Sequence, residues 1–138
     1  MANKFSVSIV TQSRLAFEGE AEFVSLPGQL GQFAIMSGHM PLIASLEYGL
    51  ITIKNDNDTR VGTIFGGFAE VVEGAVTVLA QDFQWPNEID PDRARRDLER
   101  AQRQAQEATT DLEAKRAKLA IDRANLRLEV SAYDITKR

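Results

Sequence analysis

The residues best suited to chemistry in this chain are arginines in its last third. They recur at intervals of three or four residues in two sets, Arg93, Arg96, Arg100 and Arg103, and then Arg123 and Arg127. Such intervals align side chains on one face of an α-helix. Because a guanidinium group can donate two parallel hydrogen bonds to a phosphate, this spacing favours a polyphosphate-binding site. The alternative is a solvated helix face whose arginines pair with carboxylates such as Asp97 and Asp122.

Two helices are expected to position these arginines. Asp90 suits the N-cap of a helix and Pro91 its first position, where the missing N–H costs nothing. Small apolar residues then repeat at helical spacing: Ala94, Leu98, Ala101, Ala105, Ala108 and Leu112. A second series is out of phase with the first: Ala114, Ala117, Ile121, Ala124 and Leu128. The shift favours two antiparallel helices joined near residues 109–112, although one long helix with a phase break would also fit.

Folding this hairpin about residue 111 would bring arginines of both helices together. Arg100 would lie level with residue 122, and residue 95 level with Arg127. The arginines would then meet at the open end of the hairpin, beside the N-terminus of the first helix, which also suits phosphate. Because the facing positions are mostly alanine, the helices would bury little apolar surface. The hairpin is therefore either an ordinary helical pair packed on the rest of the chain or a switch that opens.

Residues 1–86 have the pattern of a β-sandwich. Short apolar or alternating segments are separated by turn residues, which predicts about eight to ten short strands. Examples are FSVSI (5–9), EAEFVSL (20–26), LITIK (50–54), RVGTIF (60–65), FAEVV (68–72) and AVTVLAQ (75–81). The segment 20–26 has the pattern of an edge or outer strand. His39, the one histidine, lies between glycine and proline and is read as a turn residue. The NDND run at 55–58 is a hairpin loop, because it lacks the glycine and terminal glutamate of a calcium loop.

Composition limits the function further. The 138-residue chain has a net charge of −4, which gives no indication of nucleic-acid binding. Residues 1–87 carry a net charge of −5 and residues 88–138 a net charge of +1, which suggests two units. The chain has no cysteine, no apolar run long enough to span a membrane and no secretory signal, so a cytosol-like compartment is expected. No nucleophile–base pair or metal cluster is visible, so a non-catalytic protein is expected rather than a small hydrolase.

With these residues in view, the whole chain resembles the epsilon subunits of bacterial F-type ATP synthases. The resemblance rests on GQFAIMSGHMPLIASLEYGLITI (31–53) and FGGFAEVVEGAVTVLAQ (65–81). In the second half, Ile89, Asp90, Arg93 and Ala94 match the Ile/Leu-Asp-x-x-Arg-Ala motif that binds ATP in some members of this family. The fold implied is a β + α arrangement, with an N-terminal β-sandwich (1–86) that docks on the rotor, followed by a C-terminal antiparallel two-helix hairpin (87–138) that regulates.

The resemblance also implies partners and a ligand. The sandwich would dock on the gamma subunit and the c-ring, on the cytoplasmic face of the bacterial plasma membrane. The hairpin would permit ATP hydrolysis when folded on the sandwich, and would inhibit it when extended toward a beta subunit. ATP would be a regulatory ligand rather than a required cofactor, and would hold the folded state. Its expected contacts, which include positions found from helical spacing, are Ile89, Asp90, Arg93, Ala94, Arg100, Arg123 and Arg127.

One alternative role and one departure from the family pattern leave it open whether the hairpin regulates hydrolysis. A purely structural module that binds the rotor without switching would have the same sandwich and hairpin. Gln84 stands where nucleotide-binding members of the family can carry an acidic residue, which predicts altered contacts to the nucleotide.

Overall fold

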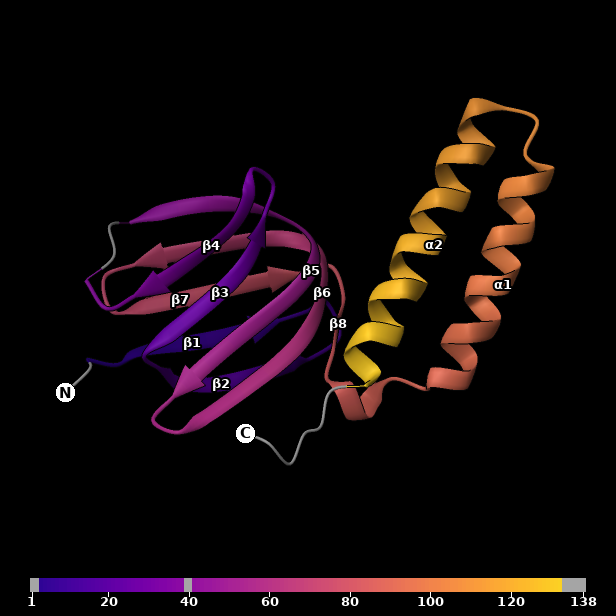
Figure 1. Cartoon of the computed structure of the whole chain (residues 1–138). Helices are drawn as coiled ribbons and strands as arrows, with labels where there is room; N and C mark the ends of the chain where they lie inside the picture. Colours follow the sequence, from indigo (N-terminus) through magenta and orange to yellow (C-terminus); the bar gives the residue numbers. More distant parts are fainter. Residues whose placement is uncertain (1–2, 39–40, 133–138) are drawn as a thin grey trace.

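The computed structural model describes residues 3–38 and 41–132. A β-sandwich occupies one side of the molecule and a pair of antiparallel helices the other, with α2 next to the sandwich and α1 outside it (Figure 1). His39, Met40 and the last six residues of the expected hairpin unit lie outside the described residues.

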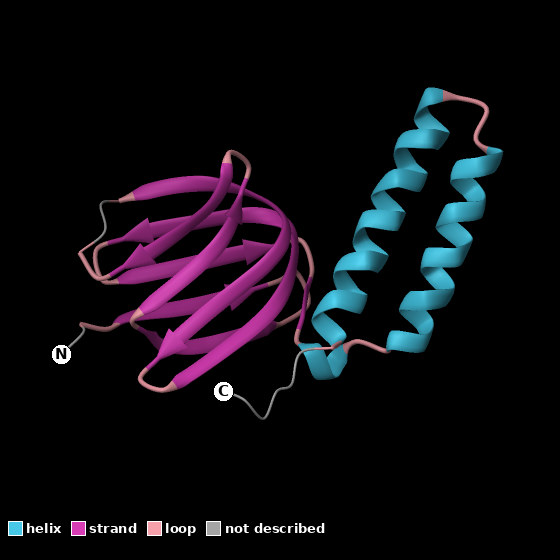
Figure 2. Cartoon of the chain, in the orientation of Figure 1, coloured by secondary structure: helices cyan, strands magenta, loops and turns pink. Residues whose placement is uncertain are grey.

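The sandwich is built from eight strands followed by one turn of 3₁₀-helix. The strands are β1 (Phe5–Val10), β2 (Leu15–Ala21), β3 (Phe23–Gly28), β4 (Gly31–Met36), β5 (Leu42–Asn55), β6 (Asp58–Val72), β7 (Ala75–Ala80) and β8 (Phe83–Gln84), and η1 is Pro86–Glu88. The hydrogen-bonded order is β2-β1-β7-β6-β5-β3-β4, and β8 pairs with β6. Figure 2 shows the strands curving around one interior, and aliphatic side chains from most of these strands form the hydrophobic core.

Two long strands join the layers. β6 pairs with β8 before its Gly66-Gly67 pair and with β7 from Gly67 onward, so it bends from one layer into the other at these glycines. Both have positive φ angles, 79° and 129°, which side-chain-bearing residues rarely adopt. A Cβ at position 67 would lie 2.1 Å from the carbonyl oxygen of Leu79, so only glycine fits there.

The division into strands differs from the expectation in three places. The predicted segments 60–65 and 68–72 are one strand, since Gly66 and Gly67 allow a bend where a turn was expected. The predicted outer strand 20–26 is split between the end of β2 and the start of β3, and β3 is an interior strand between β4 and β5. β2 itself was missed, because its glycine and two glutamates conceal the apolar alternation.

The helices confirm the predicted hairpin and its start. α1 spans Pro91–Glu107 and α2 spans Asp111–Ser131. Asp90 caps α1: one of its carboxylate oxygens accepts hydrogen bonds from the backbone N–H groups of Asp92 and Arg93. Thr110 caps α2 by accepting from Glu113 N at 3.1 Å. Each helix therefore begins where a short polar side chain satisfies its first free N–H groups.

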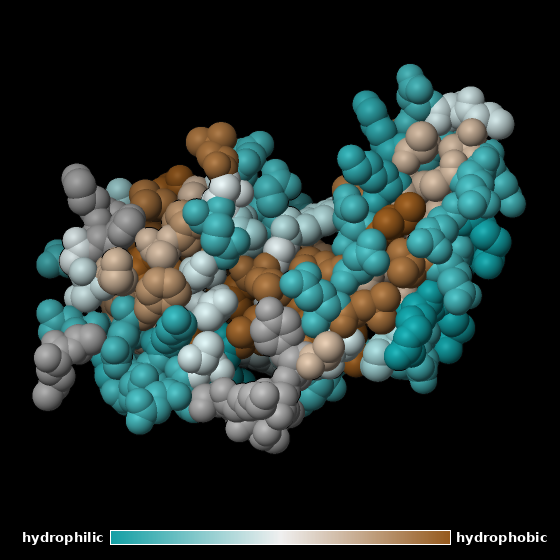
Figure 3. Space-filling model, in the orientation of Figure 1, coloured by the Kyte–Doolittle hydropathy of each residue, from teal (hydrophilic) through white to brown (hydrophobic). Residues whose placement is uncertain are grey.

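The seam between the helices is buried only over part of its length. The buried alanines are Ala94, Ala101, Ala117 and Ala124, and they lie at equal sequence distances from residue 109. Toward the connection, the predicted seam residues Ala105, Leu112 and Ala114 are exposed, contrary to expectation. Apolar atoms remain visible along the hairpin between its hydrophilic flanks (Figure 3). A contact this small contributes little to holding the helices together.

Candidate functional site

The segment between the two units is fixed to the sandwich. Arg14, from the β1–β2 connection, donates hydrogen bonds from both terminal nitrogens to the Glu88 carboxylate, at 2.6 and 2.7 Å. The Glu88 carboxylate also accepts from the backbone N–H of Trp85 at 2.8 Å. Trp85 packs edge-on against Phe83, with ring centroids 4.7 Å apart, and the Arg60 guanidinium lies 4.2 Å from its ring. The chain therefore leaves the sandwich after Glu88, at Ile89 and Asp90.

These contacts predict a pH dependence of stability. Hydrogen bonds from Arg14, and then from the Trp85 backbone, lower the pKa of Glu88 although burial opposes the shift. The pKa of Glu88 is lower in the folded state than in the unfolded state. Its contribution to the free energy of unfolding is therefore complete above the unfolded pKa of about 4.3, and it is lost as the pH falls through the folded pKa. The side chains of Arg14 and Glu88 are both more than a quarter exposed, so water screens their attraction. We therefore expect Glu88→Gln to lower the free energy of unfolding by at most about 1 kcal/mol at pH 7.

Urea unfolding followed by the fluorescence of Trp85, the single tryptophan, would measure this effect. The difference in unfolding free energy between the parent chain and Glu88→Gln should shrink between pH 7 and pH 3. Glu73→Gln, in the exposed turn after β6, is the matched control and should change stability little at either pH. A difference for Glu88→Gln that does not vary with pH would contradict the assigned role of the carboxylate.

A cavity of about 230 Å³ lies where the sandwich, η1 and both helices meet. Its lining residues are Gln84, Glu88, Ile89, Asp90, Arg93, Ala94, Asp97 and Arg127. Five of the seven predicted site residues are among them. The sequence reasoning did not include Glu88 and Asp97 in the site, and it noted Gln84 only as a departure from the family pattern.

The N-terminus of α1 contributes no free donor to this cavity. Pro91 has no N–H, and the N–H groups of Asp92 and Arg93 are bonded to the Asp90 side chain. The next N–H, that of Ala94, is bonded to the Asp90 carbonyl oxygen at 3.0 Å. The expectation that this helix terminus holds a phosphate stays a prediction, and it would require these N–H groups to exchange their present partners. Unless they do, any anion in the cavity must be held by side chains.

Arg127 is the most constrained cation of the cavity. Its Nε donates to Gln84 Oε1 at 2.8 Å, and its guanidinium carbon lies 4.5 Å from the Phe65 ring centroid. The Asp82 carboxylate is 3.9 Å from its terminal nitrogen. Burial lowers the pKa of Arg127 from its ordinary value; the Asp82 and Asp97 carboxylates oppose this shift, and the charges of Arg123 and Arg93 add to it. Arg93 and Arg127 both line the cavity, so an anion between these two guanidinium groups would offset part of their mutual repulsion.

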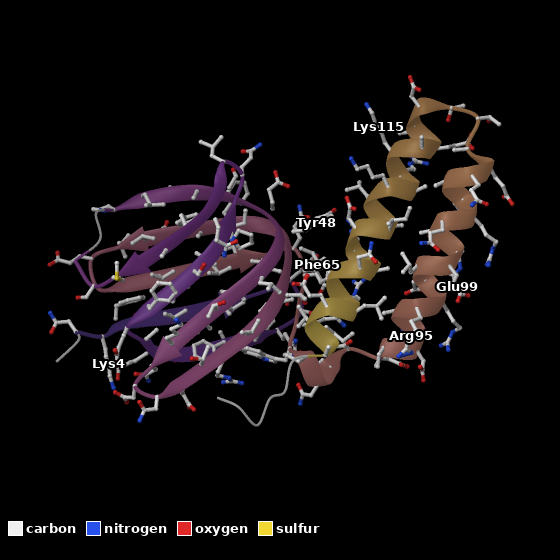
Figure 4. The ribbon with its side chains drawn as sticks, viewed as in Figure 1. Lys4, Tyr48, Phe65, Arg95, Glu99 and Lys115 are labelled. Atoms are coloured by element: carbon white, nitrogen blue, oxygen red, sulfur yellow. The ribbon has the colours of Figure 1, made fainter. Side chains whose placement is uncertain are left out.

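The remaining predicted arginines point elsewhere. Arg123 donates to the Tyr48 hydroxyl at 2.6 Å, and its guanidinium carbon is 5.0 Å from the Tyr48 ring centroid. Tyr48 and Phe65 lie on the side of the sandwich that faces α2 (Figure 4). Arg100 pairs with Asp97 at 3.6 Å, with a side chain 62% exposed. The helix connection is centred on residue 109 rather than 111, which places Arg93 level with residue 125, between Arg123 and Arg127, and Arg100 level with Lys118.

The side chains that line the cavity could bind a ligand with both anionic and hydrogen-bond-donating groups. Arg93 and Arg127 can donate to phosphate oxygens, while the carboxylates of Asp90 and Asp97 can accept from hydroxyl or amino groups. The volume is below the roughly 300–1,000 Å³ of sites that enclose a whole drug-sized ligand, so a nucleotide would be held partly outside it. No group of His, Cys, Asp and Glu able to hold a metal ion occurs among the residues that the structure describes.

A membrane-spanning helix is also missing from the described residues. Neither α1 nor α2 is both long and apolar enough to cross a bilayer.

Comparison with known proteins gives two family matches that together run through most of the chain. The β-sandwich domain of the ATP synthase delta/epsilon chain matches residues 4–86, and the long α-helix domain of the same chain matches residues 87–132.

Curated relatives and solved structures agree with these matches. The ATP synthase epsilon chain of Bacillus cytotoxicus is 39% identical over 92% of this chain and 96% of its own length. That of Syntrophobacter fumaroxidans is 36% identical over 95% and 98%, respectively. A chain in the cryo-EM structure of the Euglena gracilis mitochondrial ATP synthase superposes with a TM-score of 0.81 at 18% identity, over 94% of this chain and 82% of that one.

Proposed function

The chain belongs to the delta/epsilon chain family of ATP synthase, and we propose that it serves as the epsilon subunit of the central stalk. In this role it links the catalytic head to the c-ring and regulates ATP hydrolysis. The observation that carries the proposal is the match of both units, sandwich and helical pair, over nearly the full length of epsilon chains from several bacteria. The subunit would lie at the cytoplasmic face of the plasma membrane as a peripheral part of the complex.

An exposed apolar surface on the sandwich supports docking on the gamma subunit. Ile43, Phe68 and Leu79 project from the outer face of three adjacent strands, β5, β6 and β7, and all are at least half exposed. Phe68 lies directly opposite Leu79 in the strand register, and Ile43 is diagonal to Phe68. Contiguous exposed apolar side chains of this kind are typical of protein–protein interfaces. We assign this outer surface, made of Ile43, Phe68 and Leu79, to gamma.

Replacement of Phe68 by glutamate should therefore disrupt the stalk. A central aromatic side chain in an interface contributes about 2 kcal/mol or more, so we expect binding to purified gamma to weaken by at least about 30-fold. Surface plasmon resonance on immobilised gamma would measure the change.

Leu15→Glu is the matched control for this experiment. Leu15 and Phe68 are equally exposed, 55% each, but Leu15 is on edge strand β2 outside the assigned surface. Equal losses in the two variants, or no loss for Phe68→Glu, would remove the assignment to gamma. Because Phe68 is exposed, the variant sandwich should remain folded.

The helical pair supports a regulatory role. Its partly exposed alanine seam and its small contact with the sandwich make a folded arrangement that a modest free energy can shift. In the folded arrangement hydrolysis would proceed, and in an extended one the basic helices would reach a beta subunit and inhibit it. The exposed cations available for an acidic partner include Arg96, Arg103, Lys115, Arg116 and Lys118.

ATP is the proposed ligand of the cavity. Its phosphates would be held by Arg93 and Arg127, with Arg100 and Arg123 approaching after a change of rotamer, and Ile89, Asp90 and Ala94 would complete the site. A ligand at 100 times its dissociation constant stabilises the binding-competent state by about 2.7 kcal/mol. That is sufficient to shift a weakly packed helical pair toward the folded arrangement.

A further inference from the structure

We propose that Tyr48 and Phe65 form an aromatic latch that holds the helical pair on the sandwich through Arg123 and Arg127, independently of a bound nucleotide. The aromatic latch consists of these four residues. It rests on the proposed function only in assuming that the pair has two arrangements, because its contacts are internal to the chain.

The latch spans the gap between the two units at two successive turns of α2. Arg123 and Arg127 are four residues apart and therefore project from the same face of the helix. Each guanidinium lies against an aromatic ring of a different strand, Tyr48 of β5 and Phe65 of β6. The two rings contact each other edge to face, with centroids 6.0 Å apart. The rings and guanidinium groups thus form one continuous contact.

Each arginine also donates a hydrogen bond to the sandwich. Arg123 donates to the Tyr48 hydroxyl at 2.6 Å and Arg127 to Gln84 at 2.8 Å. These four interactions come from only two side chains of α2, while Leu119 and Leu126 of the same helix line a pocket beside Tyr48. The arginines therefore account for much of what orients α2 on the sandwich.

The geometry requires arginine rather than any cation. A planar guanidinium can stack on a ring and donate hydrogen bonds from its edge at the same time, which the ammonium group of lysine cannot do. Arg127→Lys should consequently weaken the latch although it preserves the charge. An effect of Arg127→Lys would distinguish the aromatic latch from a general electrostatic attraction between a basic helix and an acidic sandwich, because the substitution preserves the charge.

The latch also sets an order for ligand binding. Arg127 lines the cavity while its ring contact and its Nε bond remain in place, so a phosphate can approach its terminal nitrogens directly. Arg123 is turned toward Tyr48 and does not line the cavity. A ligand that recruits Arg123 must break the Tyr48 contact, so the Tyr48 half of the latch and the ligand compete for one arginine.

The test is a distance measurement on the full chain without nucleotide. The chain contains no cysteine, so Asp58→Cys and Gln104→Cys, both exposed, place spin labels on the sandwich and on α1 alone. Pulsed electron resonance then gives the populations of folded and open arrangements. We expect Tyr48→Leu and Arg123→Ala each to raise the open-to-folded ratio by roughly tenfold, as loss of a cation–π contact with a charged hydrogen bond implies. Tyr48→Phe, which retains the ring, should have a smaller effect.

Controls make each outcome decisive. Arg103→Ala removes an exposed arginine of α1 that has no contact with the sandwich in the described structure, and it should leave the distance distribution unchanged. If Tyr48→Leu unfolds the sandwich, as Trp85 fluorescence would reveal, Arg123→Ala alone decides, because its side chain lies at the helix surface. An unchanged distribution in Arg123→Ala would overturn the latch. Repeating the measurement with ATP tests the nucleotide site separately, since a chain that does not bind ATP can still be latched.

Discussion

Truncation of the chain after Glu88 is expected to leave a folded sandwich that still joins the central stalk, and to increase ATP hydrolysis by the assembled enzyme. The cut follows Glu88 because its carboxylate bonds to Arg14 and to the Trp85 backbone, so removing it would loosen the end of the sandwich. The hydrophobic core draws its members from the strands and not from the helices, which is why the sandwich should fold alone. Circular dichroism and Trp85 fluorescence would confirm the fold.

The size of the effect follows from the populations of the two arrangements. If the extended helices block the rotor in about nine-tenths of enzyme molecules, removing them raises hydrolysis by about tenfold. Full-length chain reconstituted in parallel is the control, and binding to gamma should be equal in the two preparations. Hydrolysis that is unchanged while the truncated chain is fully incorporated would favour the alternative of a purely structural module, which binds the rotor without switching.

The sequence predicted most of the fold because its local signals agree with one another. Asp90 and Pro91 fixed the start of α1, and the turn residues at 56–57 and 73–74 correctly separated β5 from β6 and β6 from β7. β2 was lost because Glu18, Gly19 and Glu20 mask a strand that is half exposed at an edge of the sheet. In β6, Gly66 and Gly67 normally indicate a turn, but here they let one strand bend between the layers. Whether such glycines form a turn or a bend depends on the pairing of β6 with β7, which is not visible in the local sequence.

Five of the seven predicted site residues line the cavity, and the placement of Arg100 differs because of an offset in the helix connection. The helix connection was placed about two residues too late, which set Arg100 level with residue 122 instead of Lys118. A Thr-x-x-Glu sequence at 110–113 is the start signal that would have corrected it, since Thr110 does cap α2. The aromatic partners Tyr48 and Phe65 had no such signal, because aromatic residues in strands are ordinarily read as core.

Substitution of Arg127 by alanine should weaken ATP binding to the isolated chain by roughly 30- to 100-fold. Its guanidinium lines the cavity, is held in place by Gln84 and the Phe65 ring, and is partly desolvated, with a side chain only 26% exposed. A preoriented charged donor in such surroundings contributes about 2–3 kcal/mol to binding of an anion. Isothermal titration calorimetry with ATP would measure the dissociation constants.

The other arginines give a graded series that tests the site rather than the total charge. Arg93→Ala should cost nearly as much as Arg127→Ala, because it lines the same cavity. Arg123→Ala should also weaken binding, but less, because Arg123 must first leave Tyr48, and Arg100→Ala should weaken it least, because Arg100 is mostly exposed and paired with Asp97. Arg103→Ala removes the same charge from the outer face of α1 and should leave affinity unchanged. If all five variants lost affinity equally, the attraction would be a property of the basic helices as a whole, and the cavity at their open end would not be the place where the phosphates bind.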